Sequence, residues 1–161
     1  MKHKYVITLI IVVIILFCII ILSFNDINMN SALGLKVPLL TKREKIELQN
    51  GDFFNEEKVV KIHLSSMQLK RIKNRVQKNE NWKNEKLDER LEEKIKMHTR
   101  EDIFFQIPNI EDCYWTFTNR SNGINDKHSI DELVEDKMYY AISLGILDLE
   151  NKTLYYYEFD K

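Results

Sequence analysis

The sequence contains few glycine, proline and cysteine residues: 4 Gly, 2 Pro and 2 Cys among 161 residues. With so little Gly and no glycine-rich phosphate loop, nucleotide sites of the Walker and Rossmann types are excluded. Two cysteines exclude a disulfide scaffold, and the low Gly and Pro content excludes a collagen-like fibre. The length and composition also argue against a multi-domain enzyme and a bundle of membrane helices.

A long hydrophobic run lies near the N-terminus. Of its 20 residues, Tyr5 to Phe24, only Thr8 and Ser23 are not hydrophobic, and none is charged. Twenty helical residues rise about 30 Å, which matches the hydrocarbon thickness of a bilayer. A lone segment in lipid can pair its backbone groups only as a helix. We therefore predict a single transmembrane helix, since so small a domain could hardly bury all sides of such a segment.

Cleavage as a signal peptide is the alternative fate of this segment. Lys2 and Lys4 suit the start of a signal peptide, but the hydrophobic run exceeds the usual length of about 7–15 residues. The nearest approach to a cleavage site, Ser31–Gly34, lies several residues beyond its end, and Cys18 does not follow a small residue as a lipoprotein cysteine would. We expect an uncleaved signal anchor over residues 1–24.

The charges around the anchor predict its orientation. Lys2 and Lys4 precede it, whereas residues 25–30 follow it without a cation. This asymmetry favours a cytoplasmic N-terminus and an extracytoplasmic C-terminal domain in the cell membrane. Three further cations weaken the asymmetry, because they lie within the range that counts: Lys36, Lys42 and Arg43.

Residues 25–57 are predicted to be a polar linker. The segment is rich in Asn at its start and charged after Lys42. Its beginning resembles a calcium loop, but Ser31 replaces the required Gly and Val37 replaces the closing Glu. We therefore expect no ion site there.

Residues 58–161 are predicted to form a small α+β domain, with two helices packed on a three- to four-stranded antiparallel sheet. The β-branched run Lys58–Leu64 predicts a strand. A helix follows, with an N-cap at Ser65 or Ser66 and hydrophobic residues spaced by three and four. Those residues are Leu69, Ile72 and Val76. A second helix begins near Leu87 or Asp88.

The last third of the sequence is aromatic and predicts strands. Cys113–Thr118 is one, and Tyr139–Leu149 with Leu154–Phe159 forms a hairpin. Within the hairpin, small and bulky residues alternate between 141 and 146, and we expect the bulky face to pack on the helices. Asn122-Gly123 predicts a turn, and a short helix is expected from Ser129 to Val134.

The charges divide along the chain. Residues 36–100 carry 17 Lys and Arg against 11 Asp and Glu, whereas residues 101–161 carry 5 against 13. One interpretation is a basic surface near anionic lipid or another polyanion, together with an acidic face for a partner. The other is a solvated pair of helices whose positive charge is balanced by an acidic sheet beside them. The second is favoured, because the basic residues are interspersed with Glu.

The candidates for nucleophilic catalysis are few. A nucleophile needs a base within reach and a group that orients the base. Cys113 is the only cysteine in the predicted domain, and no motif links it to a histidine. The candidate bases are His63, His98 and His128. We expect Cys113 to be a buried structural residue, and no disulfide, because Cys18 would lie in the membrane.

Other motifs also favour structural interpretations. His98, Glu101 and Asp102 lack the spacing of a zinc protease site, and the acidic cluster at 131–136 is typical of a solvated face. The members of that cluster are Asp131, Glu132, Glu135 and Asp136. The basic run Lys70–Lys78 does not predict nucleic-acid binding, given the anchor and the net charge of −1. Tyr155–Tyr157 fits a central strand better than an exposed patch.

The sequence therefore predicts a membrane-anchored binding domain and no enzyme. We expect no catalytic residue, no cofactor and no metal. The predicted partners are the bilayer, through Tyr5–Phe24, and a protein or another component of the cell envelope, but not nucleic acid. Frequent Ile, Lys and Asn are typical of a bacterial protein. Two alternatives stay open: a small anchored enzyme that uses Cys113 with a histidine, and an anchored protein that protects against a toxin.

Overall fold

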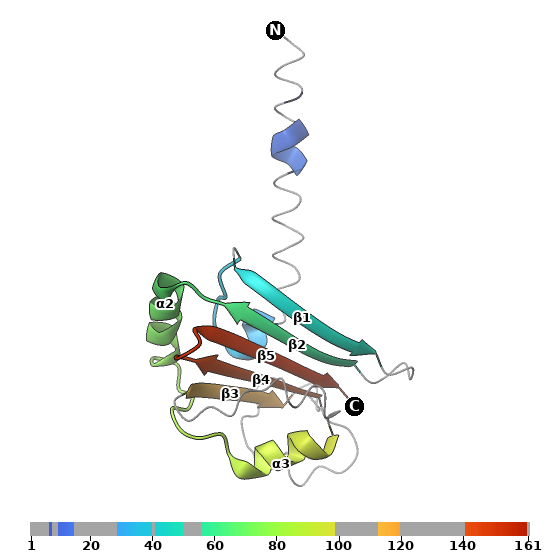
Figure 1. Ribbon diagram of the computed structural model, residues 1–161, viewed down its shortest axis with the longest axis vertical. Coiled ribbons are helices and arrows are strands. Elements are labelled where there is room, and N and C mark those ends of the chain that lie inside the picture. The colour runs from blue at the N-terminus through green and yellow to red at the C-terminus, as the bar shows by residue number, and fades with distance from the viewer. Residues whose placement is uncertain are drawn as a thin grey trace.

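The structure is a computed structural model that describes residue 7 and residues 10–14, 29–39, 41–49, 56–98, 113–119 and 141–160. The described part of the chain is an α+β domain built on a five-stranded antiparallel sheet (Figure 1). The strand order is β1-β2-β5-β4-β3. The elements in chain order are β1 (Lys42–Gln49), β2 (Glu56–His63), α2 (Ser66–Val76), α3 (Glu89–His98), β3 (Cys113–Asn119), β4 (Ala141–Asp148) and β5 (Thr153–Asp160).

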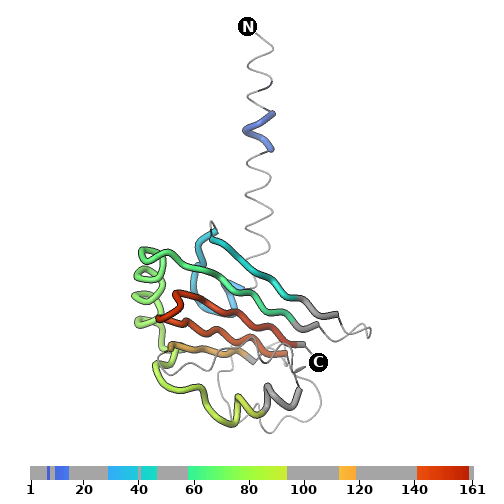
Figure 2. The backbone as a smooth tube through the Cα atoms, viewed as in Figure 1, coloured from blue at the N-terminus to red at the C-terminus, as the bar shows by residue number. Residues whose placement is uncertain are grey.

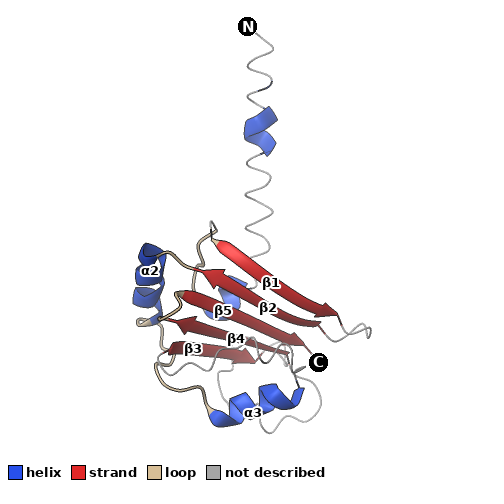
Figure 3. Ribbon diagram, in the orientation of Figure 1, coloured by secondary structure: helices blue, strands red, loops and turns tan. Residues whose placement is uncertain are grey.

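Most of the elements are those that the sequence predicts (Figure 3). The strand after residue 57, both helices, the aromatic strand and the C-terminal hairpin are confirmed. The sheet has five strands and not three to four, because β1 lies inside the predicted linker. β1 is an edge strand in which most residues are charged. Charged side chains protect an open sheet edge from pairing with another chain. Because they also interrupt the alternation of hydrophobic and polar residues, the strand is not recognised from its sequence pattern.

Helix α2 shows why local sequence was sufficient for some elements. The Ser65 hydroxyl accepts a hydrogen bond from the Gln68 backbone N–H at 3.3 Å, and the Gln68 side chain accepts one from the Ser65 N–H at 2.8 Å. This reciprocal capping box satisfies two backbone donors that the first turn leaves free. Ile72 and Val76 then lie on one side of the helix and are buried. The N-cap and the inward face are both confirmed.

The sheet is covered on both faces, which we call the α3 face and the α2 face. The α3 face packs against Leu91 of α3 and buries Val59, Trp115, Phe117, Ile142, Leu144, Ile146, Tyr157 and Phe159. The α2 face packs against Ile72, Val76 and Trp82 and buries Val60, Ile62, Tyr114, Leu147, Leu154 and Tyr156. The bulky residues of β4 therefore pack on α3, as the sequence predicts, but α2 lies on the opposite face, which the sequence does not predict.

The segment at residues 29–37 completes the core of the α2 face. Residues 29–33 are helical, and the segment's buried side chains are Met29, Leu33, Leu35 and Val37. The Trp82 indole N–H donates to the Leu33 carbonyl oxygen at 2.9 Å, and the Thr118 hydroxyl donates to the Ala32 carbonyl oxygen at 3.0 Å. The predicted linker at 25–57 is corrected accordingly, because residues 29–37 pack in the core and β1 pairs with β2. Figure 2 shows the coloured part of this segment beside the sheet.

Several predictions fall on residues that the structure does not describe. They are the turn at Asn122-Gly123, the helix from Ser129 to Val134, and most of the predicted anchor. Within the anchor, residues 10–14 are described and are helical. Among the described residues, no helix has the length and hydrophobicity needed to cross a bilayer.

Gly145 of β4 lies where the 29–37 segment approaches the sheet most closely. A Cβ atom at this position would overlap Leu33 Cδ2, and it would lie 3.1 Å from Trp82 Cη2 and 3.3 Å from Thr116 Cγ2. Its neighbour across the strand pair is Tyr156, a large buried side chain. Leu33 therefore packs directly against the face of β4 that carries the small residues.

We expect Gly145→Ala to lower the free energy of unfolding by about 1–3 kcal/mol, the usual cost of overfilling a packed core. Urea unfolding of the full chain in detergent measures this change. In a Leu33→Ala background the overlap disappears, so the same substitution should cost less. Additive costs in the double variant would show that Leu33 does not restrict this position.

Candidate functional site

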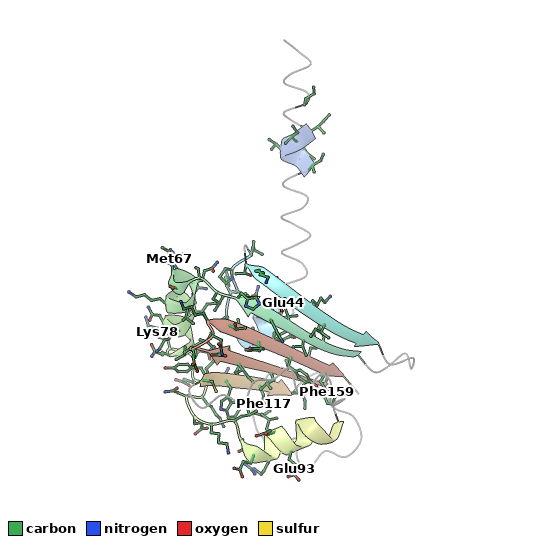
Figure 4. All side chains as sticks on the ribbon, viewed as in Figure 1. Glu44, Met67, Lys78, Glu93, Phe117 and Phe159 are labelled. Carbon is green, nitrogen blue, oxygen red and sulfur yellow. The ribbon has the colours of Figure 1, made fainter. Side chains whose placement is uncertain are left out.

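The outward side of α2 and the segment before β1 form a basic surface. We define the basic surface by six cationic residues: Lys36, Lys70, Arg71, Lys73, Arg75 and Lys78. Five are exposed and Lys73 is half-buried. Because Ile72 and Val76 face the core, the cations of α2 lie on its remaining sides, and Lys78 is labelled on this part of the molecule in Figure 4. Between Lys58 and Asn79 the sequence contains no Asp or Glu.

The cations of the basic surface have no carboxylate partner among the described residues. Elsewhere in the domain, lysines do lie beside carboxylates: Lys42 Nζ is 3.2 Å from Glu44 Oε1, and Lys86 Nζ is 3.1 Å from Glu89 Oε1. In the part of the chain that the structure describes, therefore, no carboxylate of the acidic half neutralises the positive charge of α2 by a direct ion pair.

Two of the cations also have a role within the helix. Lys73 and Arg75 lie in the last turn of α2, where positive charge complements the helix dipole. This reason does not extend to Lys70 and Arg71 in the middle of the helix or to Lys36 outside it. The excess of positive charge is thus larger than helix stability requires.

A shallow, open pocket of about 440 Å³ lies within the basic surface, between α2 and the 29–37 segment. Its lining residues are Asn30, Ser31, Gly34, Leu35, Lys36 and Arg75. The Arg75 Nη1 donates to the Lys36 carbonyl oxygen at 3.0 Å, which fixes the guanidinium at the pocket. The lining contains two cations and no carboxylate.

The turn that forms the pocket is held from both sides. The Asn30 side-chain oxygen accepts from the Val37 N–H at 2.8 Å, and the Asn79 amide donates to the Gly34 carbonyl oxygen at 3.2 Å. Gly34 has a φ of +60°, a left-handed conformation that glycine adopts without steric cost. The sequence analysis missed this site, although the alternation of Leu33, Leu35 and Val37 was a signal for a packed segment.

Cys113 and His63 lie in one row across the α3 face but far apart. Cys113 pairs with Asp148, Asp148 with Thr153, and Thr153 with His63. Three strand spacings separate the cysteine from the histidine, about 14 Å at the usual distance between strands. Cys113 is buried, and its thiol lies 3.9 Å from the Glu85 carbonyl oxygen. The side chain of His98 and the whole of His128 lie outside the described residues.

His63 instead contacts an exposed carboxylate. Its Nε2 lies 3.2 Å from Glu44 Oε1. The hydrogen bond from Lys42, followed by the one from His63, lowers the pKa of Glu44. Exposed pairs of this kind contribute little to stability. Farther along the same face, burial raises the pKa of Tyr155, and the nearby charges of Asp148 and Glu44 raise it further.

The remaining candidates take structural places. Tyr156 and Tyr157 are buried on opposite faces of the central strand β5, which confirms the structural interpretation of the three tyrosines. The described residues contain no group of three or more His, Cys, Asp or Glu side chains that could hold a metal ion. Glu101, Asp102 and the acidic cluster at 131–136 lie outside the described residues.

Comparisons with known proteins found no matching family model, no matching curated protein and no matching solved structure.

Proposed function

We propose that this chain is a single-pass membrane protein that presents its α+β domain at the membrane surface as a binding domain. The observation that carries the proposal is the exposure of the described anchor residues. Ile7 and residues 10–14 expose 46–58% of their surface, and all six are Ile or Val. Five consecutive helical residues cover more than one full turn. The helix is therefore apolar on all sides, and the described domain covers none of them.

A helix that is apolar all round is stable in hydrocarbon and not in water. The full run Tyr5–Phe24 has the length that a bilayer requires. Lys2 and Lys4 before the run support a cytoplasmic N-terminus, which would place the domain outside the cytoplasm.

A binding role for the domain is supported by the distribution of its polar groups. On β3, β4 and β5 both faces of the sheet are filled by packed side chains. The basic surface with its pocket is a charged area that the described domain presents to solvent. The separation of Cys113 from His63 gives the alternative of a Cys–His enzyme no geometric support.

Alkaline extraction and protease treatment together test the proposal. We expect the full chain to stay with membranes at alkaline pH, and we expect protease added to intact cells to digest the domain. Release by alkali would contradict the anchor. A domain that stays intact while an external marker is digested would contradict the external placement.

A further inference from the structure

We propose that the basic surface binds the phosphate groups of anionic lipids in the same bilayer that holds the anchor, with one phosphate seated in the pocket beside Lys36 and Arg75. The inference rests on the membrane anchoring proposed above and names the partner of the candidate site. This contact would hold the domain in one orientation on the bilayer, whereas a domain attached only through the anchor could rotate freely.

Chain length brings the basic surface to the bilayer. Asn30 and Ser31 of the pocket follow Phe24 by six and seven residues. Even a fully extended chain spans at most about 3.6 Å per residue, so Asn30 lies no more than about 22 Å from the end of the anchor. Met29 and Leu33 pack in the same buried cluster as Ile72 and Val76 of α2. The pocket is therefore tethered within about 22 Å of the end of the anchor, and α2 packs beside it.

Charge complementarity selects the lipid headgroups. Six cations without a described carboxylate partner lie on this surface, and a negative bilayer attracts clusters of Lys and Arg close to it. The attraction falls off within a Debye length of about 8 Å at physiological salt, so it acts only on side chains close to the surface. Arg75 is already held in place by the Lys36 carbonyl and presents donors to a phosphate oxygen.

Hydrophobic side chains accompany the cations. Outside the anchor, the large hydrophobic residues that the described chain exposes are Leu39 and Met67, at 42% and 66%. Met67 lies in the first turn of α2, as Figure 4 shows, and Leu39 follows Lys36 by three residues. The apolar face of α2 is buried in the core, so these two exposed side chains are what this surface offers to the headgroup region of a bilayer. A soluble polyanion would use the cations but not these two residues.

Lysine footprinting of the full chain in nanodiscs tests the proposal. One preparation contains only phosphatidylcholine, and the other contains one third phosphatidylglycerol. Acetylation by a soluble reagent is followed by mass spectrometry at Lys70, Lys73 and Lys78, with the exposed Lys86 as internal control. We expect phosphatidylglycerol to slow the acetylation of Lys70, Lys73 and Lys78 by about threefold or more and high salt to reverse the effect, because salt screens the attraction. Lys86 should not change.

A pair of matched variants identifies the surface. Arg71→Glu with Lys78→Glu reverses two charges on the basic surface and leaves Lys70 and Lys73 as reporters. Lys42→Glu with Arg90→Glu makes the same charge change at exposed positions elsewhere and keeps Lys86 as the internal control. The first variant should lose the lipid-dependent protection, and the second should keep it. Circular dichroism checks that both variants are folded.

The possible failures are distinguishable. A chain that does not co-elute with either nanodisc would contradict the anchor itself. Co-elution with equal rates of lysine acetylation in both lipids, or protection that salt does not change, would overturn the lipid inference. Neither result would contradict the anchor. Stronger protection by heparin in detergent than by phosphatidylglycerol nanodiscs would assign the surface to a soluble polyanion, and would also overturn it.

Discussion

Two arginines in the middle of the hydrophobic segment should release the chain from the membrane. Val13 and Ile14 lie near the centre of the Tyr5–Phe24 run, and both side chains are about half exposed on the described helix. An arginine at the centre of an inserting helix costs about 2.5–3.5 kcal/mol, so Val13→Arg with Ile14→Arg should cost about 5–7 kcal/mol. We expect most of the variant to leave the alkali-resistant membrane fraction, as measured by immunoblotting.

Two controls separate this effect from damage to the domain. Val13→Leu with Ile14→Leu keeps the segment hydrophobic and should stay in the membrane. Asn81→Arg with Asn84→Arg adds the same charge at exposed positions of the folded domain and should also stay. If the Val13 and Ile14 arginine variant remained membrane-bound while both controls behaved as expected, another part of the chain would be responsible for attachment.

Trp82→Ala should strongly destabilise the domain. The Trp82 side chain is only 6% exposed and packs on the α2 face between the sheet and the 29–37 segment. Its removal deletes a large buried ring and leaves the Leu33 carbonyl oxygen without the indole donor. Removing a buried tryptophan costs about 3–5 kcal/mol, a large part of the stability of a small domain. Urea unfolding measures the loss.

Trp82→Phe is the matched control, because it keeps most of the ring and removes the indole N–H. We expect it to cost less than the alanine variant. Hydrogen exchange of the Leu35 and Val37 amides adds a local measurement, since these N–H groups donate to the Asn30 carbonyl and side-chain oxygens. Both amides should exchange faster in Trp82→Ala. Unchanged exchange would mean that the 29–37 segment is not held by Trp82.

The fold was predictable where neighbouring residues carry the information. The capping box at Ser65 and Gln68, the inward spacing of Ile72 and Val76, and the alternation within β4 are all local patterns. β1 was not predictable in this way. Only Ile46 of its described side chains packs against the core, and its pairing with β2 depends on a register that joins residues such as Lys42 and His63 across 21 positions.

The candidate site, too, was predictable only in part. The sequence shows a basic run at Lys70–Lys78 but cannot show whether carboxylates neutralise it, since those could come from any part of the chain. It also cannot show that Lys36 joins the same surface, because the contact between the Arg75 guanidinium and the Lys36 carbonyl spans 39 positions. The separation of Cys113 from His63 likewise follows from strand order and not from spacing in the sequence.

By itself, the sequence determined the hydrophobic segment, the two helices, the C-terminal hairpin and the positive charge of α2. Each depends on side chains within a few residues of one another, where hydrophobicity, capping and charge act locally. The tertiary structure decided that residues 29–37 and β1 belong to the domain, that β3, β4 and β5 are packed on both faces, and that a pocket opens beside Arg75. These features depend on hydrogen bonds and packing between residues dozens of positions apart, such as Trp82 with Leu33, and no local pattern specifies such pairs.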